Sequence, residues 1–237
     1  MRRVFAIGDI HGCVDELNVL LDHLAPGVDD VVVFLGDYID RGPTPKGVID
    51  RLLRLRREAV RTVFIKGNHE DMFLDFLGLG GHYGEAFLYN GGGPTLRSYG
   101  LAGLDGAEVA ARLPADHREF LSQLVTYHRD GDFLFVHAGI RPQRRLEEQN
   151  EEDMIWIREE FTQQPHDLGC TVLFGHTPFR EVLVDLPYKI GLDTGVVYRN
   201  KLSCFETGAK ALFQVARGER KVRERSLAGQ FAASRSA

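Results

Sequence analysis

The fold of this chain of 237 residues is decided by residues 31–42, which read VVVFLGDYIDRG. A β-branched run of this length that ends at a glycine predicts a buried strand, so Asp37 would leave the sheet at its carboxyl edge. Open α/β sheets place their chemistry at that edge. For this loop alone a structural interpretation stays open, in which Asp37 and Asp40 form turns and Arg41 is an exposed ion-pair partner. The residues at the ends of the other strands must therefore show whether this loop is structural or functional.

The first third of the chain repeats one plan of strand, polar loop and helix. Strands are predicted at residues 4–7, 31–35 and 60–65, and each is followed by a loop with Asp, Asn or His residues and then by a helix with apolar periodicity. Such repeats predict a largely parallel sheet with right-handed crossovers. Later strands are predicted at residues 132–136, 171–174, 181–185, 188–192, 195–198, 201–206 and 211–215.

Polar side chains follow five of these strands and would meet at one edge of the sheet. A single histidine after a strand is more often a turn or core residue than a ligand, but five such coincidences favour a metal site. Carboxylate, amide and imidazole groups without thiolates suit Mn, Fe or Zn at an open hydrolytic position, whereas a closed structural zinc site would favour cysteine. The candidate ligands are Asp9, His11, Asp37, Asn68, His69, His137 and His176.

The central loop has the residues that phosphoryl chemistry needs. Asp37 is the natural carboxylate to bridge two cations, which would lower the pKa of a shared water and turn it into the attacking hydroxide. Arg41 and Arg158 could bind the oxygens of a phosphoryl group through their guanidinium forks. For Arg158 a salt bridge within a helix, to Glu151, Glu159 or Glu160, is the open alternative.

His69 is placed to act as the general acid. It follows Asn68 directly, so it would lie beside the metals and could protonate the leaving oxygen. Asp40 would orient His69 and raise its pKa.

Composition narrows the class of protein. The net charge of −5 gives no reason to expect nucleic acid as a partner, and no apolar run is long enough to suggest a membrane span. The three cysteines are odd in number and widely spaced, which favours reduced thiols and a cytoplasmic protein. We expect one domain over residues 1–216, followed by a basic, mobile tail over residues 217–237.

The loops resemble the signature motifs of the phosphoprotein phosphatase (PPP) family of metallophosphoesterases. The matching segments are GDIHG at residues 8–12, GDYIDRG at 36–42, GNHE at 67–70, HAG at 137–139 and GHT at 175–177. The resemblance implies an α/β fold of the calcineurin-like type, a β-sandwich of two mixed sheets flanked by helices. It amends the simpler picture of one parallel sheet.

The resemblance also implies a role for each site residue. One of two divalent cations, with Mn²⁺ as the expected metal and Fe or Zn as alternatives, would be held by Asp9, His11 and Asp37. The other would be held by Asp37, Asn68, His137 and His176. Phosphate would be bound by Arg41, Arg158 and Asn68, and the acid pair would be His69 with Asp40.

Within the family, the residues favour a bacterial-type serine/threonine protein phosphatase that hydrolyses phosphomonoesters of proteins or small molecules. Diadenosine tetraphosphatases resemble this chain in size, but they typically lack the Asp at position 40 and have Asp where Glu70 stands. A bis(5'-nucleosyl)-tetraphosphatase is the alternative. A metal-binding adaptor without catalysis is a remote third possibility, disfavoured because every proposed ligand and His69 are present.

Overall fold

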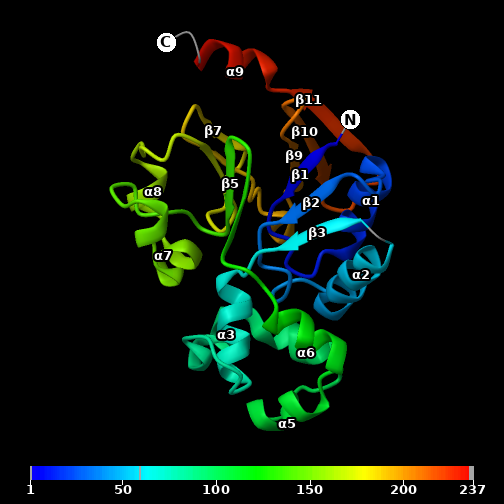
Figure 1. The fold of residues 1–237 in the computed structure, drawn as a ribbon. Helices are drawn as coiled ribbons and strands as arrows, with labels where there is room; N and C mark the ends of the chain where they lie inside the picture. Colours follow the sequence, from blue (N-terminus) through cyan, green and yellow to red (C-terminus); the bar gives the residue numbers. More distant parts are fainter. Residues whose placement is uncertain (1, 59, 235–237) are drawn as a thin grey trace.

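The computed structural model describes residues 2–58 and 60–234, and these residues form two mixed β-sheets packed face to face (Figure 1). The first sheet has six strands in the order β11-β10-β9-β1-β2-β3. Strands β1, β2 and β3 pair in parallel, and β9 pairs antiparallel to β1. The bounds of the strands are β1 Val4–Ile7, β2 Val31–Phe34, β3 Arg61–Phe64, β9 Lys201–Glu206, β10 Ala211–Ala216 and β11 Val222–Ser226.

The second sheet has five strands in the order β4-β5-β6-β8-β7. Its centre is parallel, because β5 pairs with β6 and β6 with β8 in that sense, while β4 and β7 are antiparallel edges. The strands are β4 Tyr127–Asp130, β5 Phe133–Val136, β6 Thr171–Phe174, β7 Leu183–Asp185 and β8 Lys189–Gly191.

Alternation of side chains along the strands creates the layers. In β1, Val4 and Ala6 face the second sheet, and Phe5 and Ile7 face the helices. In β5, Phe133 and Phe135 complete the core between the sheets, while Leu134 and Val136 face outward to a third cluster. Because both faces of these strands are buried, they read as continuous apolar runs and not as alternating ones.

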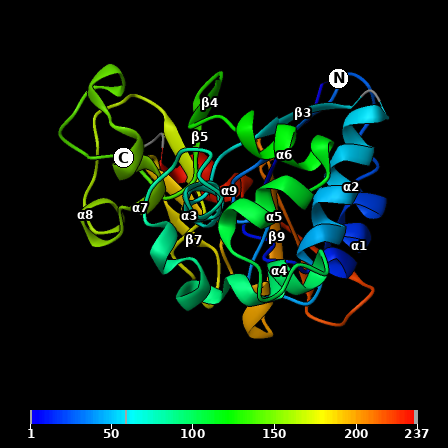
Figure 2. The same ribbon diagram turned by 90° about the horizontal axis from the view of Figure 1, so that it is seen from below.

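Helices cover the two outer faces of the sandwich. Viewed from below, α1 (Val14–Leu24) and α2 (Pro45–Arg57) flank one side, and α7 (Glu151–Trp156) and α8 (Glu159–Thr162) flank the other (Figure 2). Helices α3 (Asn68–Phe76), α4 (Gly93–Ser98), α5 (Gly106–Arg112) and α6 (Ala115–Ser122) gather where β1, β2 and β3 end. Short helical turns lie at Gly84–Ala86, Leu88–Gly92, Leu146–Glu148 and Val196–Tyr198. None of the described helices is long and apolar enough to cross a membrane.

The two mixed sheets predicted from the resemblance are confirmed, and the picture of one largely parallel sheet is wrong. In the first sheet the departure starts with β9, which returns from residue 201 to pair antiparallel with β1 and is followed by antiparallel β10 and β11. Residues 195–198 were predicted as a strand, but Val196–Tyr198 form a 3₁₀ turn that starts at Gly195 with φ of 65°. A glycine in this left-handed conformation ends the extended run.

Residues beyond 216 have more regular structure than the predicted mobile tail. Strand β11 pairs with β10 through five residues, and α9 (Ala228–Ser234) follows it. Leu227 is 1% exposed and packs in the core between the sheets, and the ring of Phe231 stacks on Phe205. The charged side chains of β11 point to solvent on an edge strand, so no apolar pattern revealed it. The boundary at residue 216 stays a prediction, and residues 235–237 of the tail lie outside the described residues.

Leu227→Ala tests whether this last segment is part of the core. We expect the free energy of unfolding to fall by about 2–5 kcal/mol, because the change leaves a cavity between the sheets. Urea denaturation measures it, with Val28→Ala as the control, because Val28 is 62% exposed. Equal midpoints for the two variants would show that the segment does not pack on the sheet.

Candidate active site

The predicted metal ligands and the acid pair come together at the carboxyl ends of strands β1, β2, β3, β5 and β6. Each of these side chains is at most 5% exposed. Polar groups buried to this extent need partners, because unpaired ones are costly. The residues are Asp9, His11, Asp37, Asp40, Asn68, His69, His137 and His176.

Asp37 lies at the centre of the cluster. Its Oδ2 is 3.4 Å from Nε2 of His11, and its Oδ1 is 3.4 Å from Nε2 of His137. Two sets of potential metal ligands share this carboxylate, one with His11 and His69 and one with His137 and His176. This is the position that a bridging carboxylate between two cations would need.

Hydrogen bonds to the backbone orient the histidine rings toward Asp37. Nδ1 of His11 lies 2.8 Å from the carbonyl of Ile39, and Nδ1 of His137 lies 2.7 Å from that of Leu35. A carbonyl only accepts, so each Nδ1 carries the proton and each Nε2 keeps a lone pair. Burial lowers the pKa of His11 to about 3 and also lowers that of His137. Both rings are therefore neutral, as a metal ligand must be.

The side chains of Asn68, His137 and His176 face one another in the set of ligands expected around the second cation. Oδ1 of Asn68 lies 3.1 Å from the lone pair on Nε2 of His137 and 2.9 Å from Nδ1 of His176. Nε2 of His176 is buried and has no hydrogen-bond partner among the described residues. A lone pair turned toward amide and carboxylate oxygens is unfavourable unless a cation lies between them, so the residues fit a divalent metal.

Asp9 closes the cluster on the side of β6. Both of its carboxylate oxygens accept from the backbone N–H of His176, at 3.1 and 3.0 Å. Burial raises the pKa of Asp9, and the nearby carboxylates of Asp193 and Asp37 raise it further. Like charges at this distance repel, and a bound cation would relieve that repulsion.

The predicted acid pair is present as a short hydrogen bond. Nδ1 of His69 lies 2.6 Å from Oδ2 of Asp40, and Thr95 donates to Oδ1 of the same carboxylate at 2.5 Å. Burial pulls the pKa of His69 down, but Asp37 and Asp40 together bring it above its usual value. Nε2 of His69 has no hydrogen-bond partner among the described residues, so it is free to give a proton to a substrate oxygen.

The two predicted phosphate-binding arginines flank the cluster. Arg41 places Nη1 2.8 Å from Nε2 of His11 and holds its guanidinium 5.8 Å from the ring centre of Tyr198. Arg158 is exposed and donates to the carbonyl of His176 at 3.3 Å. It forms no ion pair with another described residue, so the alternative of a salt bridge within a helix is wrong.

The loops are held in an unusual backbone conformation. Of the nine described non-glycine residues with positive φ, five are site residues: His11, Asp37, Asp40, Arg41 and His176. Such strain persists only where surrounding contacts enforce it, and it gathers at functional sites. Gly36, with φ of 103°, lets the chain turn closely, because a Cβ there would lie 2.7 Å from Nδ1 of His137.

Three further residues support the site and were not predicted to do so. Thr95 reaches Asp40 from α4, in a part of the chain without a readable pattern. Glu70 accepts hydrogen bonds from the loop after β2. Asp193 is buried beside Asp9, and burial raises its pKa to about 6. It follows β8 just as Asp37 follows β2, so the strand-end rule could have found it.

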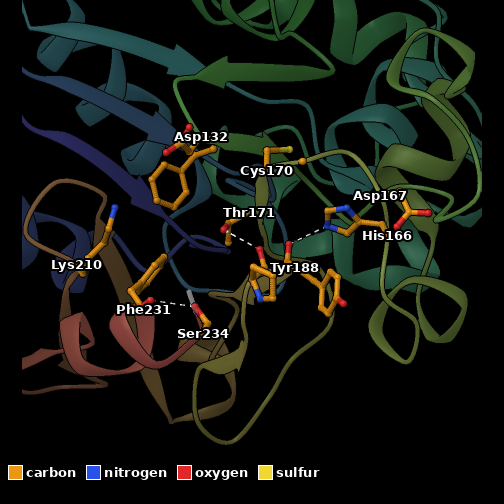
Figure 3. Close-up of a pocket in the computed structure, with 12 residues that line it drawn as sticks. Asp132, His166, Asp167, Cys170, Thr171, Tyr188, Lys210, Phe231 and Ser234 are labelled. Carbon is orange, nitrogen blue, oxygen red and sulfur yellow. Dashed lines mark hydrogen bonds between the residues drawn. The ribbon is translucent and has the colours of Figure 1, made fainter. Parts of the chain in front are cut away.

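A cavity of about 580 Å³ lies away from this cluster (Figure 3). It opens between the starts of β5 and β6 and helix α9, at the opposite end of these strands from the site. Its lining contains none of the predicted site residues and includes Asp132, His166, Cys170, Tyr188, Lys210 and Phe231. This cavity is therefore separate from the candidate active site, which lies at the carboxyl ends of the strands.

Comparison with known proteins assigns the family. Residues 2–213 match the family described as calcineurin-like phosphoesterase, so the chain belongs to that family. It is 26% identical to the asymmetrical bis(5'-nucleosyl)-tetraphosphatase PrpE of Bacillus velezensis, covering 84% of this chain and 86% of that one. It is 30% identical to serine/threonine-protein phosphatase 1 of Salmonella typhimurium, covering 85% and 90%. A crystal structure of a putative diadenosine tetraphosphatase, 28% identical, superposes with a TM-score of 0.67 over 90% of this chain and 93% of that one.

Asp37→Asn tests the predicted bridge. We expect metal content to fall from two ions per chain and turnover to drop by more than about 100-fold, because the amide cannot supply two anionic oxygens. Elemental analysis of the purified protein measures the metal, and exposed Asp22→Asn is the control. Two bound ions with unchanged turnover would exclude Asp37 as the bridge.

His69→Asn and Asp40→Asn test the acid pair. His69→Asn should lower kcat by about 100- to 10,000-fold while the metal content stays the same, because proton donation to the leaving oxygen is lost. Asp40→Asn should act in the same direction but less strongly, because it leaves the ring in place and removes its anionic partner, which orients the ring and raises its pKa. Full activity of His69→Asn would show that the proton comes from elsewhere.

Proposed function

We propose that the protein hydrolyses bis(5'-nucleosyl) tetraphosphates to a nucleoside monophosphate and a nucleoside triphosphate. The observation that supports this is that relatives from several bacteria, each aligned over 83–90% of this chain, are named asymmetrical bis(5'-nucleosyl)-tetraphosphatases. The solved structure of a putative diadenosine tetraphosphatase, similar over 90% of this chain, supports the same conclusion.

The residues present would hold two divalent cations, and the oxygen and nitrogen donor set suits Mn²⁺ best, with Fe or Zn as alternatives. Following the resemblance, one site would use Asp9, His11 and Asp37, and the other Asp37, Asn68, His137 and His176. All of these side chains are buried in the cluster. When bound, such a pair of cations polarises the phosphoryl group and lowers the pKa of water in the site.

The side chains of the protein would perform the remaining steps. Arg41 and Arg158 bind non-bridging oxygens of the phosphate under attack, and Asn68 adds a contact between them. The oxygen of water joins the phosphorus at one end of the tetraphosphate, a proton of that water passes to solvent, and the bond from the phosphorus to the bridging oxygen breaks. His69, oriented by Asp40, gives its proton to the departing oxygen of the nucleoside triphosphate.

A serine/threonine protein phosphatase is the second candidate function. The relative from Salmonella typhimurium carries that name and is 30% identical over 85% of this chain. The same centre would serve a phosphomonoester, because the groups that contact the phosphate do not depend on what the phosphate is attached to. The motifs alone favoured a phosphoprotein substrate. The larger number of similar proteins named tetraphosphatases supports a nucleotide substrate better. A non-catalytic adaptor stays disfavoured, because every proposed ligand and His69 are present and buried together.

A comparison of rates tests the proposal. With Mn²⁺ added, kcat/KM for diadenosine tetraphosphate should exceed that for a phosphoserine peptide and for p-nitrophenyl phosphate by at least about tenfold. Chromatography of the products should show equal amounts of AMP and ATP. Two molecules of ADP would contradict the position of cleavage, and a preference for the phosphopeptide would establish the second candidate instead.

A further inference from the structure

An apolar cavity of about 380 Å³ lies beside the metal-ligand cluster. It is lined by Tyr83, Ala86, Glu152 and Trp156, from the segment after α3 and from α7. The ring of Trp156 is 6.2 Å from that of His176 and 5.6 Å from that of Tyr83, both in edge-to-face orientation. The cavity is therefore separated from a predicted metal ligand by a single aromatic side chain.

The two aromatic side chains of this cavity, which we call the Trp156–Tyr83 shelf, are held in place by specific contacts. Tyr83 has φ of 63° and donates through its hydroxyl to Glu152 at 2.6 Å. Tyr83 is 44% exposed, and Nε1 of Trp156 has no hydrogen-bond partner among the described residues. A bulky residue kept in a strained conformation and half exposed beside a catalytic centre indicates binding rather than core packing.

The shelf lies next to a phosphate-binding group. Arg158 follows Trp156 by two residues, is exposed, and donates to the carbonyl of His176. A flat apolar surface and a guanidinium at the same edge of the metal site match the two ends of a nucleotide. The base is an aromatic plane, and its 5'-phosphate is an anion.

We infer that the Trp156–Tyr83 shelf binds the nucleobase of the nucleotide whose phosphate is attacked, which rests on the proposed function. The base would stack on the indole, with Tyr83 closing the cavity edge-on. Because the shelf adjoins His176 directly, the phosphate nearest that base is the one brought to the metals. This placement explains why hydrolysis would release a nucleoside monophosphate and not two diphosphates.

Fluorescence tests the shelf without catalysis, because Trp156 is the only tryptophan of the chain. AMP titrated into the Mn²⁺-loaded protein, with excitation at the long-wavelength edge of indole absorption, should quench the emission in a saturable way. Ribose 5-phosphate, which lacks the base, should leave it unchanged. Absence of quenching by AMP would overturn the inference, as would quenching by an apolar phosphopeptide but not by AMP.

Kinetics of substituted proteins supply the second test. Trp156→Ala should raise KM for diadenosine tetraphosphate by about 5- to 100-fold through loss of stacking, and Trp156→Phe should restore most of it. Tyr83→Leu should also raise KM, whereas Tyr127→Leu should not, because Tyr127 is 43% exposed but lies on β4 away from the cavity. The inhibition constant of inorganic phosphate should stay the same in all variants, since phosphate does not reach the shelf.

The two failures can be told apart. If the unsubstituted protein does not cleave diadenosine tetraphosphate, the proposed function is wrong, and AMP quenching still decides whether a base binds at Trp156. If it does cleave this substrate but Trp156→Ala has the same KM, the shelf is not the base site.

Discussion

The carboxylate of Glu70 joins the two loops on which the centre depends. Its Oε2 accepts from the backbone N–H groups of Asp37 and Gly67, at 2.9 and 3.1 Å, and its Oε1 accepts from Tyr38 at 2.8 Å. Glu70 is fully buried, and burial together with the charge of Asp37 raises its pKa to about 8. These bonds help to hold the backbone of Asp37 at a positive φ of 52°. The orientation of the central carboxylate is thus set from a neighbouring helix.

The fixed position of Asp37 leads to unfavourable contacts between acceptor atoms in the cluster. The lone pair of His137 points toward carboxylate and amide oxygens in a nearly dry environment, whereas that of His11 also accepts from the guanidinium of Arg41. This arrangement destabilises the metal-free fold locally and becomes favourable when cations bind, so metal affinity and loop order are coupled. The rigid β-sandwich supplies the stability that the loops lack, because its strands are buried on both faces.

The sequence predicted the centre better than its surroundings, and the reason is physical. Strand ends are marked by the switch from apolar runs to glycine and polar residues, so Asp9, Asp37 and His137 could be placed at one edge. The pairing of β9 with β1 joins residues about 200 positions apart, and periodicity contains no information about such a partner. Thr95 reaches Asp40 from a helix without an apolar stripe, and β11 presents charges to solvent. Both were therefore missed.

The two residues that favoured a protein phosphatase from the motifs cannot themselves select a substrate. Asp40 and Glu70 are fully buried, and their oxygens bond to His69, Thr95 and backbone N–H groups. They fix the positions of His69 and of the loop after β2, which would be the same for any phosphate ester. Outside the metal-ligand cluster, the groups open to a substrate include the half-exposed side chains of Tyr83 and Tyr198 and the exposed guanidinium of Arg158. These positions lie outside the signature motifs, so the motifs do not predict the class of substrate.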